Sequence, residues 1–522
     1  MRGVVVCPEP PAAEAGRRIF AQGGNAVDAA VAAAFAQGVA NPLGCGIGGH
    51  AAIQIYSATD ETGLYLDALV SVGSESDPAR FVRDLTGRSE RVGRYLLKGD
   101  TNQLGYSSIM IPGFVAGMGE LAARFGSGRV SWADIVSPAA DLAAEGFAIY
   151  PYLATYYTFE GPDRPGYPDV FRKLASNPRA AALYLPGGSV PHQGHVLIQE
   201  ELARTLRRIA TADAQEFYTG GVGREIAEDL RAGGGPVTSV DLASYTVRTQ
   251  MPLAMSWRDL VLHTSTPPTR GAVLLAMLRS VEHVDLTALG VNSPAYVDLL
   301  AQVTSRAFAD GARMLADPVF ASVPLEHLLS RDRAHRRSAP TTEPKHTTHV
   351  TTADSAGNMV AITHSIGSVT GSGVTTPGLG FFYNNFLGFF NPMPGHHDSM
   401  VPGKRAGGAC PTIAFRNGRP LLAIGSSGGS RLVSAVFQTL LNIFVHGMNP
   451  QEAVSAPRFH CEQDGVLYVE PTFPPDTVAS LRRMGQELVT TAYMGCNQAI
   501  MFDGDTIRSG SDPRGGMGVA VV

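Results

Sequence analysis

Charged residues are scarce in this chain, and lysine is almost missing. Charged side chains make up 17% of the 522 residues, against about 25% in an average soluble protein. Only four residues are lysines, and 41 basic against 46 acidic residues give a net charge of −5. No basic stripe is visible, so we expect no nucleic-acid partner. The hydrophobic fraction of 44% excludes a disordered chain.

Cysteine is sparse as well. The five cysteines are scattered and form no CxxC pair, which argues against a disulfide framework or a zinc site. A second candidate metal group, His396 and His397 with Asp398, has no further ligands spaced to join it. A solvated loop is therefore favoured there, and we expect no metal.

Long apolar runs are also missing. No window approaches the 18 or so uninterrupted apolar residues that a membrane-spanning helix needs. The first 20 residues lack the apolar core of a secretory signal. We therefore expect a cytoplasmic protein with no membrane partner.

The first 346 residues are predicted to be rich in helix. The segment 26–38 is alanine-rich and almost uncharged, which indicates a helix buried on all sides. A strand is expected at 51–56, and the polar segment 330–346 is expected to be an exposed loop. Further helices are expected at 11–22, 114–125, 131–145, within 197–232 and at 293–316.

The last 176 residues change character and favour strands. Two alternating stretches, 349–353 and 359–365, are joined by a turn typical of a hairpin. A second hairpin is expected through Asn417 and Gly418. The other predicted elements are strands at 379–382, 412–416, 421–424, 466–470, 498–502 and 518–522, and a helix at 430–446.

Two glycine motifs could carry chemistry. Gly44-x-Gly46-x-x-Gly49 matches the dinucleotide fingerprint, but a buried helix precedes it and a strand follows, the reverse of what phosphate binding needs. A close-packed turn is favoured there. The stretch 425–429 matches the nucleophile elbow G-x-S-x-G, with Ser427 as the nucleophile.

The elbow has the expected strand before it and helix after it, but no histidine follows in the required order. His446 or His460 would have to serve out of sequence. The alternative is that backbone N–H groups at this helix start form an oxyanion hole, and we favour it.

Thr347 lies where the polar segment ends and the strands begin. A threonine becomes a strong nucleophile when it is N-terminal, because its own α-amine can act as the general base. That requires cleavage of the chain before Thr347. On residue statistics alone, a threonine-rich strand start is by far the commoner explanation of this pattern. Ser365, on the next strand, could supply a hydroxyl to the same point.

Many ordered blocks resemble the gamma-glutamyltranspeptidase family, nearly from end to end. The stretches 23–30 and 46–49 are similar to its N-terminal signature, and Thr347-Thr348-His349 is similar to the start of its small subunit. Further matching blocks are 112–113, 116–117, 138–139, 146–147, 217–218, 306–310, 317–318, 426–431, 456–459 and 512–514.

The resemblance implies an α+β fold, a four-layer αββα sandwich of the N-terminal nucleophile hydrolase type. It implies autocatalytic cleavage between His346 and Thr347, giving a large subunit (1–346) and a small subunit (347–522) that together form one fold. It gives Thr347 the role of nucleophile and Ser365 that of its hydroxyl partner. The amides of Gly428 and Gly429 become the oxyanion hole.

The same resemblance implies no cofactor, and as partners only a small-molecule amide and the chain's own cleaved subunit. The two subunits would form a heterodimer, and the resemblance also allows a dimer of such heterodimers.

The sequence departs from the family where the glutamyl group is held. Leu69 replaces an expected arginine, Gly367 an asparagine, and Phe386 and Phe389 a glutamine and an aspartate. Gly407 and Gly408 replace two serines, and loop 391–403 is short. A buried carboxylate without partners costs several kcal/mol, so a γ-glutamyl group should bind poorly. Phe381, Phe382, Phe386, Phe389 and Phe390 suggest an apolar acyl pocket.

The prediction is thus an autoprocessing amide hydrolase or acyltransferase acting on a non-glutamyl amide. Three alternatives stay open: a true γ-glutamyltransferase and glutathione hydrolase, a serine hydrolase using Ser427, and a catalytically silent homologue. Retention of Thr347, Ser365 and the Gly428–Gly429 turn argues against the last.

Overall fold

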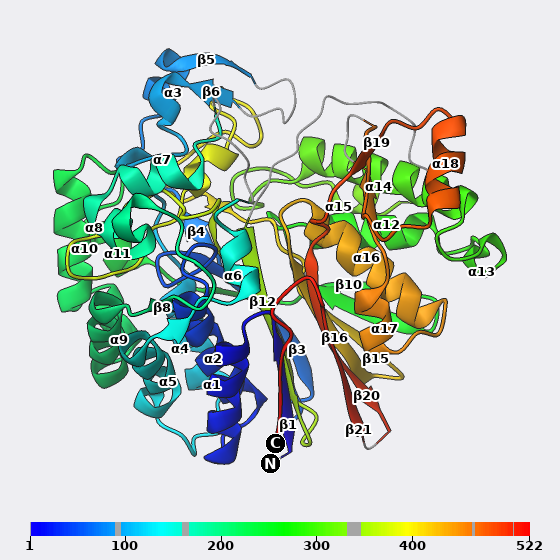
Figure 1. Ribbon diagram of the computed structural model, residues 1–522, viewed down its shortest axis with the longest axis horizontal. Coiled ribbons are helices and arrows are strands. Elements are labelled where there is room, and N and C mark those ends of the chain that lie inside the picture. Colours follow the sequence, from blue (N-terminus) through cyan, green and yellow to red (C-terminus); the bar gives the residue numbers. More distant parts are fainter. Residues whose placement is uncertain (1, 89–94, 159–165, 331–345, 462–464, 505) are drawn as a thin grey trace.

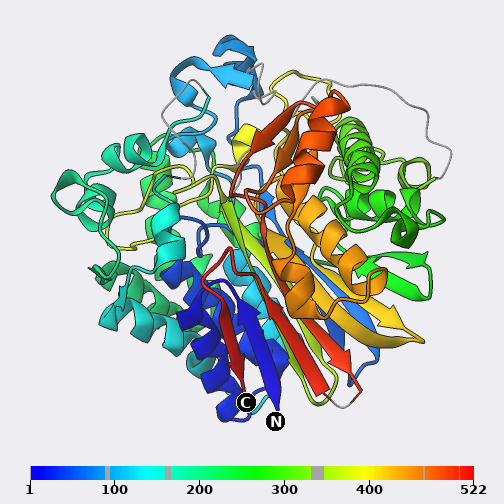
Figure 2. The same ribbon diagram turned by 45° about the vertical axis from the view of Figure 1, so that its right-hand side comes forward.

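Two antiparallel sheets pack face to face, and helices cover both outer faces (Figures 1 and 2). The computed structural model describes residues 2–88, 95–158, 166–330, 346–461, 465–504 and 506–522. This is the four-layer αββα arrangement that the sequence predicts. Within these residues, no helix is both long enough and apolar enough to cross a membrane.

The first sheet has seven strands and contains both ends of the chain. Its order is β22 (Gly518–Val521), β1 (Gly3–Cys7), β12 (His346–Asp354), β13 (Met359–Gly367), β2 (His50–Ser57), β3 (Thr62–Ala68) and β9 (Arg248–Gln250). On β1, Val5 pairs with Thr352 on one side and Ala520 on the other. Segments from before and after residue 346 therefore alternate in one hydrogen-bonded ladder, and the termini lie side by side (Figure 1).

The second sheet has six strands in the described part of the chain. Its order is β10 (Leu253–Trp257), β11 (Leu260–Thr264), β15 (Thr412–Arg416), β16 (Arg419–Ser427), β20 (Cys496–Asp503) and β21 (Thr506–Ser511). The predicted turn between β15 and β16 is confirmed, because Asn417 and Gly418 both have positive φ (51° and 75°). Two-residue hairpin turns favour this pair of conformations.

The helix predicted at 26–38 is α2 (Ala26–Ala40), and every one of its residues is buried. It begins in a capping box, with the Asn25 side chain accepting from the Asp28 amide and the Asp28 side chain accepting from Asn25. The helix lies against β12 and β13, so it supports the strands that carry Thr347 and Ser365.

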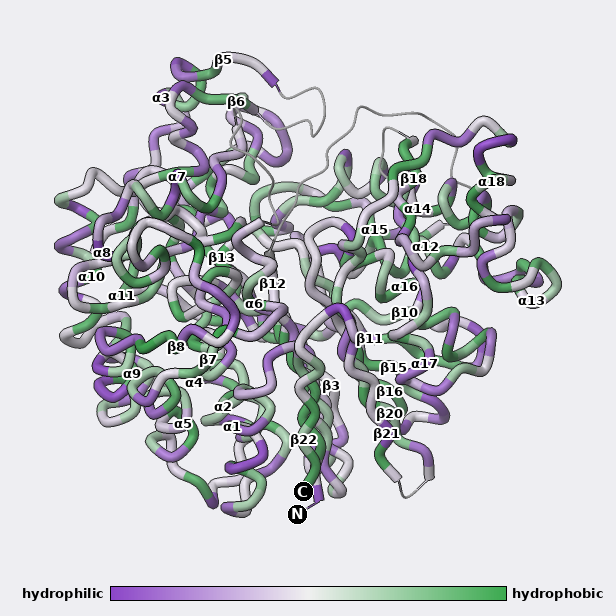
Figure 3. The backbone as a smooth tube through the Cα atoms, in the orientation of Figure 1, coloured by the Kyte–Doolittle hydropathy of each residue, from purple (hydrophilic) through white to green (hydrophobic). Residues whose placement is uncertain are grey.

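Most helices of the outer layers lie at or near the predicted positions, whereas α12 (Gly271–Ser280) and α17 (Pro450–Ser455) were not predicted. The helices on the side of the first sheet are α1 (Pro10–Ala21), α4 (Phe114–Phe125), α5 (Trp132–Glu145), α9 (Glu200–Ala212) and α10 (Gly221–Ala232). The second sheet is covered by α12, α14 (Pro294–Met314), α16 (Arg431–Phe444) and α17. Figure 3 shows hydrophobic residues gathered along the central strands, and hydrophilic ones mainly on outer turns.

Short elements complete the described chain. The helices are α3 (Pro78–Arg83), α6 (Pro151–Thr155), α7 (Val170–Ala175), α8 (Pro178–Tyr184), α11 (Ser239–Ser244), α13 (Leu286–Leu289), α15 (Leu325–Leu328) and α18 (Pro475–Arg483). The strands are β4 (Val70–Ser71), β5 (Leu85–Arg88), β6 (Tyr95–Leu97), β7 (Phe147–Ala148), β8 (Val196–Leu197), β14 (Arg405–Ala406), β17 (Phe459–Cys461), β18 (Leu467–Val469) and β19 (Leu488–Thr490).

The prediction of a strand at 379–382 is wrong. The segment is a turn, and Gly378 and Gly380 before and within it have φ of 84° and 73°. Its aromatic side chains fill the core instead of a ladder, since Phe381 packs on Phe217 and Phe382 on Tyr184. The exposed loop expected at 330–346 falls largely on residues 331–345, which lie outside the described residues.

Candidate active site

Thr347 lies at a break in the regular pairing of β12. His346 pairs with Gly367 and Thr348 with His364, so the ladder shifts by a residue at Thr347. A β-bulge of this kind redirects a side chain and is common beside active sites. Thr347 is buried and stands next to the part of β13 that carries Ser365. The structure therefore brings together the first two residues that the sequence singles out.

Ser365 is held in a compact turn at the end of β13. Its Oγ accepts a hydrogen bond of 2.8 Å from the Gly367 amide. Gly367 has φ of 102°, a conformation that favours glycine, and a Cβ there would collide with the side chain of Asn385. The Asn385 oxygen accepts from the Ser368 amide. Gly367 thus shapes the strand end beside Ser365.

The Gly428–Gly429 turn begins where β16 ends. Both residues have positive φ, 125° and 66°, and α16 starts two residues later. β16 packs directly against β12, the strand that carries Thr347, and this turn follows at the end of β16. Backbone N–H groups at such a helix start point outward and can stabilise a developing anion.

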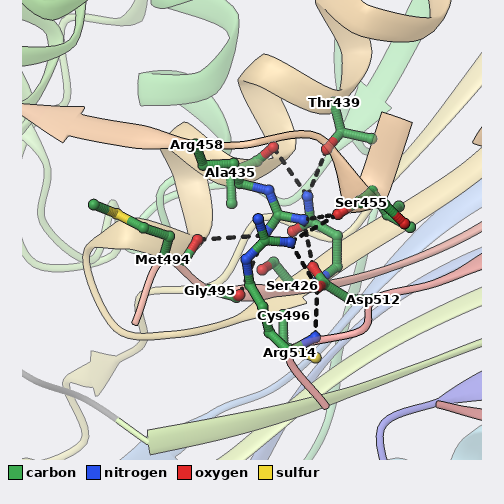
Figure 4. Close-up of polar contacts among 12 residues, drawn as sticks. Ser426, Ala435, Thr439, Ser455, Arg458, Met494, Gly495, Cys496, Asp512 and Arg514 are labelled. Atoms are coloured by element: carbon green, nitrogen blue, oxygen red, sulfur yellow. Dashed lines mark hydrogen bonds and ion pairs between the residues drawn. The ribbon is translucent and has the colours of Figure 1, made fainter. Parts of the chain in front are cut away.

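A buried ionic cluster of Arg458, Asp512 and Arg514 lies next to this turn, and Figure 4 shows its polar contacts. Gly428 packs against Gly495, whose carbonyl accepts a hydrogen bond of 3.1 Å from Arg458. Arg458 is almost fully buried and pairs with the buried carboxylate of Asp512, which Arg514 also contacts at 2.9 Å. The charges are thus mutually compensated, as burial requires.

Ser427 is not placed as a serine nucleophile would be. Its Oγ is buried, and within the described residues it has no hydrogen-bond partner. His460 Nδ1 is 2.8 Å from Ser434 Oγ, and His446 Nε2 is 3.3 Å from the Tyr296 hydroxyl. Neither histidine is paired with Ser427, so the geometry does not support the elbow hypothesis.

A cavity of about 130 Å³ lies beside these elements. Its apolar wall contains Phe386 and Phe389, whose rings are 4.9 Å apart, with Phe390 beside them. Phe386 also packs on His50, and His50 pairs with Ser365 across β2 and β13. The cavity is therefore linked to Ser365 through Phe386 and His50, and Ser365 itself is not among its lining residues.

The predicted apolar pocket needs two corrections. Phe381 and Phe382 belong to the core and do not line this cavity. The wall also includes three charged residues, Arg270, Asp398 and Arg405. The sequence singled out only Asp398 among them, and as a metal candidate, not as a pocket residue. Nothing in their spacing separates them from the other charged residues of the chain.

Two predicted substrate residues, Leu69 and Gly367, do not line this cavity. Leu69 is fully buried and packs against the position that a side chain on Gly407 would occupy. Gly407 itself lines the cavity. Arg405 is tied elsewhere, since it pairs with Asp67 at 2.8 Å and its guanidinium lies over the Tyr245 ring.

The Gly44–Gly49 motif forms a turn between α2 and β2, as its context predicts. A side chain on Gly49 would meet the Ser365 carbonyl, and one on Gly48 would meet the Phe382 carbonyl. The glycines allow the backbone to pass close behind Ser365, which explains the motif without a nucleotide.

Comparison with known proteins agrees with this geometry. The sequence profile described as Gamma-glutamyltranspeptidase matches residues 12–522. The chain belongs to the gamma-glutamyltranspeptidase family.

Relatives of this family include acylases and glutathione hydrolases. The chain is 35% identical to the Acylase ACY 1 proenzyme of Pseudomonas sp. (strain V22), over 98% of this chain and 91% of the relative. It is 29% identical to the Glutathione hydrolase proenzyme of Bacillus subtilis (strain 168), over 96% of this chain and 88% of the relative. The crystal structure of cephalosporin acylase from Bacillus halodurans superposes with a TM-score of 0.85 at 28% identity, covering 99% of this chain and 95% of that one.

The comparisons confirm two predictions made from the sequence, the fold and the class of enzyme. The fold is that of the N-terminal nucleophile hydrolases of this family. The chain is an amidohydrolase, and its relatives are made as proenzymes. The roles of individual residues remain predictions.

Proposed function

We propose that this protein is an autoprocessing acylase whose nucleophile is Thr347. The observation that carries the proposal is the β-bulge between β12 and β13, in which Thr347 stands opposite two residues of β13, Ser365 and Ile366. Attack of the Thr347 hydroxyl on the His346 carbonyl would break the peptide bond, free the Thr347 α-amine and leave His346 attached as an ester. Water would then hydrolyse that ester to the His346 carboxylate and the regenerated Thr347 hydroxyl. The fragments 1–346 and 347–522 would remain together as a heterodimer, because β1 of the first fragment lies between β22 and β12 of the second in one sheet.

Substrate turnover would use the same Thr347 hydroxyl that cleaves the chain. The Thr347 α-amine accepts the hydroxyl proton as the oxygen attacks the substrate amide, and then gives that proton to the leaving amine. The Gly428 and Gly429 amides stabilise the negative charge on the carbonyl oxygen. The resulting acyl ester is released by water, or by an acceptor amine in a transfer reaction.

The acyl group is proposed to lack the glutamyl α-amine and to be apolar, aromatic or a short acid. Phe386 and Phe389 form an apolar wall where the family has amide and acidic side chains, and Gly407 adds no polar group. Charge-assisted hydrogen bonds are worth about 1.5–3 kcal/mol each. The identity to the acylase relative is 35%, against 29% to the glutathione hydrolase. This difference supports a non-glutamyl acyl group.

A γ-glutamyl substrate is the second candidate, and one observation favours it. The cavity wall contains both a cation, Arg270, and an anion, Asp398. These opposite charges could hold a zwitterionic head group without the family's usual side chains.

One comparison separates the two candidates. kcat/KM is measured on γ-glutamyl p-nitroanilide and on the matched glutaryl p-nitroanilide, which differs only by the α-amine, with phenylacetyl p-nitroanilide as an apolar acyl group. We expect turnover of an acyl anilide without the α-amine to exceed that of the glutamyl compound by tenfold or more, about 1.4 kcal/mol. A preference for the glutamyl compound would favour the second candidate, and turnover by Thr347→Ala would contradict both.

A further inference from the structure

A buried carboxylate lies next to the residue that follows the proposed nucleophile. Glu9 is completely buried just before α1, in the N-cap position. Acidic residues at this position usually bond the first amides of the helix, but the Glu9 side chain makes no such bond. Its two oxygens instead accept from Thr348 Oγ1, at 2.8 and 3.0 Å. Helix capping therefore does not account for this side chain.

Two amides complete the surroundings of the carboxylate. Gln37 Nε2 donates to one Glu9 oxygen at 2.6 Å, and Asn41 Nδ2 donates to the other at 3.0 Å. The Gln37 amide has a fixed orientation, because its oxygen is 2.9 Å from His364 Nε2. Gln37 Nε2 also lies 2.9 Å from Thr348 Oγ1. Each of these groups offers a hydrogen to Glu9, which is the pattern that an ionised carboxylate accepts.

The carboxylate has no compensating cation among the described residues, since no ion pair involving Glu9 occurs there. Burial raises the pKa of Glu9, and the hydrogen bonds from Gln37, Asn41 and Thr348 oppose that rise. A buried acid of this kind is costly unless it is fully hydrogen-bonded. A buried Glu9 carboxylate beside Thr348 is therefore explained best by a functional role at this position.

Thr348 is the first residue of β12 after the bulge. It pairs with His364 and begins the regular ladder. Because side chains alternate along a strand, Thr348 faces Glu9 and the α2 layer, whereas His349 faces the second sheet and packs on Gly425. A rotation of Thr348 would consequently move both the α-amine and the hydroxyl of Thr347.

We propose that Glu9 is a positioning residue for catalysis: through its hydrogen bond to Thr348 it fixes the start of β12, and with it the attack geometry of Thr347. This inference rests on the proposed function, because it takes Thr347 as the nucleophile. Misplacing a reacting group by about 1 Å can cost a factor of 100 in rate. Substrate contacts lie on the opposite side of the strand, so substrate binding should change little.

The test uses the processed full-length protein and five variants. Glu9→Gln keeps the size of the side chain and removes its charge. Thr348→Val removes the hydroxyl that donates to Glu9, and Thr348→Ser restores it. The double variant Glu9→Gln/Thr348→Val tests whether both act through one contact. Glu14→Gln is the matched control, because Glu14 lies on the same helix but is partly exposed and paired with Arg17.

The probe is whichever of glutaryl and γ-glutamyl p-nitroanilide the wild-type protein turns over faster. We expect Glu9→Gln and Thr348→Val each to lower kcat tenfold or more with KM within threefold, and the double variant to be no worse than the poorer single one. Thr348→Ser should exceed Thr348→Val by tenfold, and Glu14→Gln should match the wild type. Slow or absent processing of Glu9→Gln at an unchanged Tm would also support the proposal.

A kcat within twofold of the wild type in Glu9→Gln would overturn the inference, as would equal activity of Thr348→Ser and Thr348→Val. Should Glu9→Gln fail to fold, the two Thr348 variants decide. The proposed function fails separately, by activity in Thr347→Ala. If Thr347→Ala is inactive while Glu9→Gln is fully active, only the role of Glu9 is disproved and the proposed function stands.

Discussion

The imidazole of His349 occupies the space that a side chain on Gly425 would need. The three atoms nearest to a Cβ built on Gly425 all belong to that ring. His349 is fixed from both sides, with Nδ1 2.7 Å from Thr363 Oγ1 and Nε2 2.9 Å from Thr351 Oγ1. The ring therefore cannot move aside without breaking these bonds. Gly425 lets β16 approach β12 closely enough to set the Gly428–Gly429 turn near Thr347.

Gly425→Ala should destabilise the protein and impair catalysis. Added volume in a tightly packed interior costs about 1–3 kcal/mol, and here the sheets themselves would have to separate. Thermal unfolding measures the loss. Gly87→Ala is the control, because a Cβ there meets nothing within 4 Å, and it should change stability by about 0.5 kcal/mol at most. Equal Tm values for the two variants would contradict this account.

Cleavage should occur between His346 and Thr347. Intact mass of the purified protein should show fragments of 346 and 176 residues, and size-exclusion chromatography should show them together as at least a heterodimer. Thr347→Ala should remain one chain, because it lacks the hydroxyl that starts the acyl shift. Splitting of that variant at the same bond would refute self-cleavage by Thr347.

Ser427→Ala should change the enzymatic activity only slightly. The Ser427 hydroxyl is buried without a partner among the described residues, and the backbone amides of the following turn do not depend on it. We expect kcat/KM to stay within about fivefold of the wild type, less than 1 kcal/mol. Total loss of activity in a processed, folded Ser427→Ala protein would instead support a serine elbow.

Stability should fall at mildly acidic pH because of two buried histidines. Burial lowers the pKa of His349 and of His364 to about 3, whereas the unfolded value is about 6.5. Between these values the unfolded chain binds more protons, so stability is complete above pH 6.5 and is lost as pH falls toward 3. Each histidine contributes about 1.4 kcal/mol per pH unit within that window.

The histidine contribution can be isolated with His364→Gln. Tm is followed from pH 7 to pH 4.5 in the Thr347→Ala background, so that a single chain unfolds. The Gln variant should show a shallower decline of Tm with falling pH than its parent. Parallel curves for the two proteins would mean that His364 does not titrate on unfolding.

Local sequence patterns predicted most of the secondary structure. The uncharged alanine-rich segment became the buried helix α2, and Asn417-Gly418 became the hairpin turn between β15 and β16. Each depends on neighbours in the chain: a capping box, a positive φ, or an apolar run. Segment 379–382 failed because its aromatic residues serve long-range packing, which no local pattern records.

The family and the pairing of Thr347 with Ser365 were also accessible from the sequence, since both rest on ordered motifs. The charged wall of the cavity was not, because Arg270 is more than 100 residues away in the sequence from the segment that carries Asp398 and Arg405. The same holds for Glu9 and Thr348, which lie 339 residues apart. The sequence by itself determined the elements, the nucleophile candidate and the missing glutamyl contacts. Only the tertiary structure decided which buried polar groups meet, because their free energy depends on partners that folding brings from remote parts of the chain.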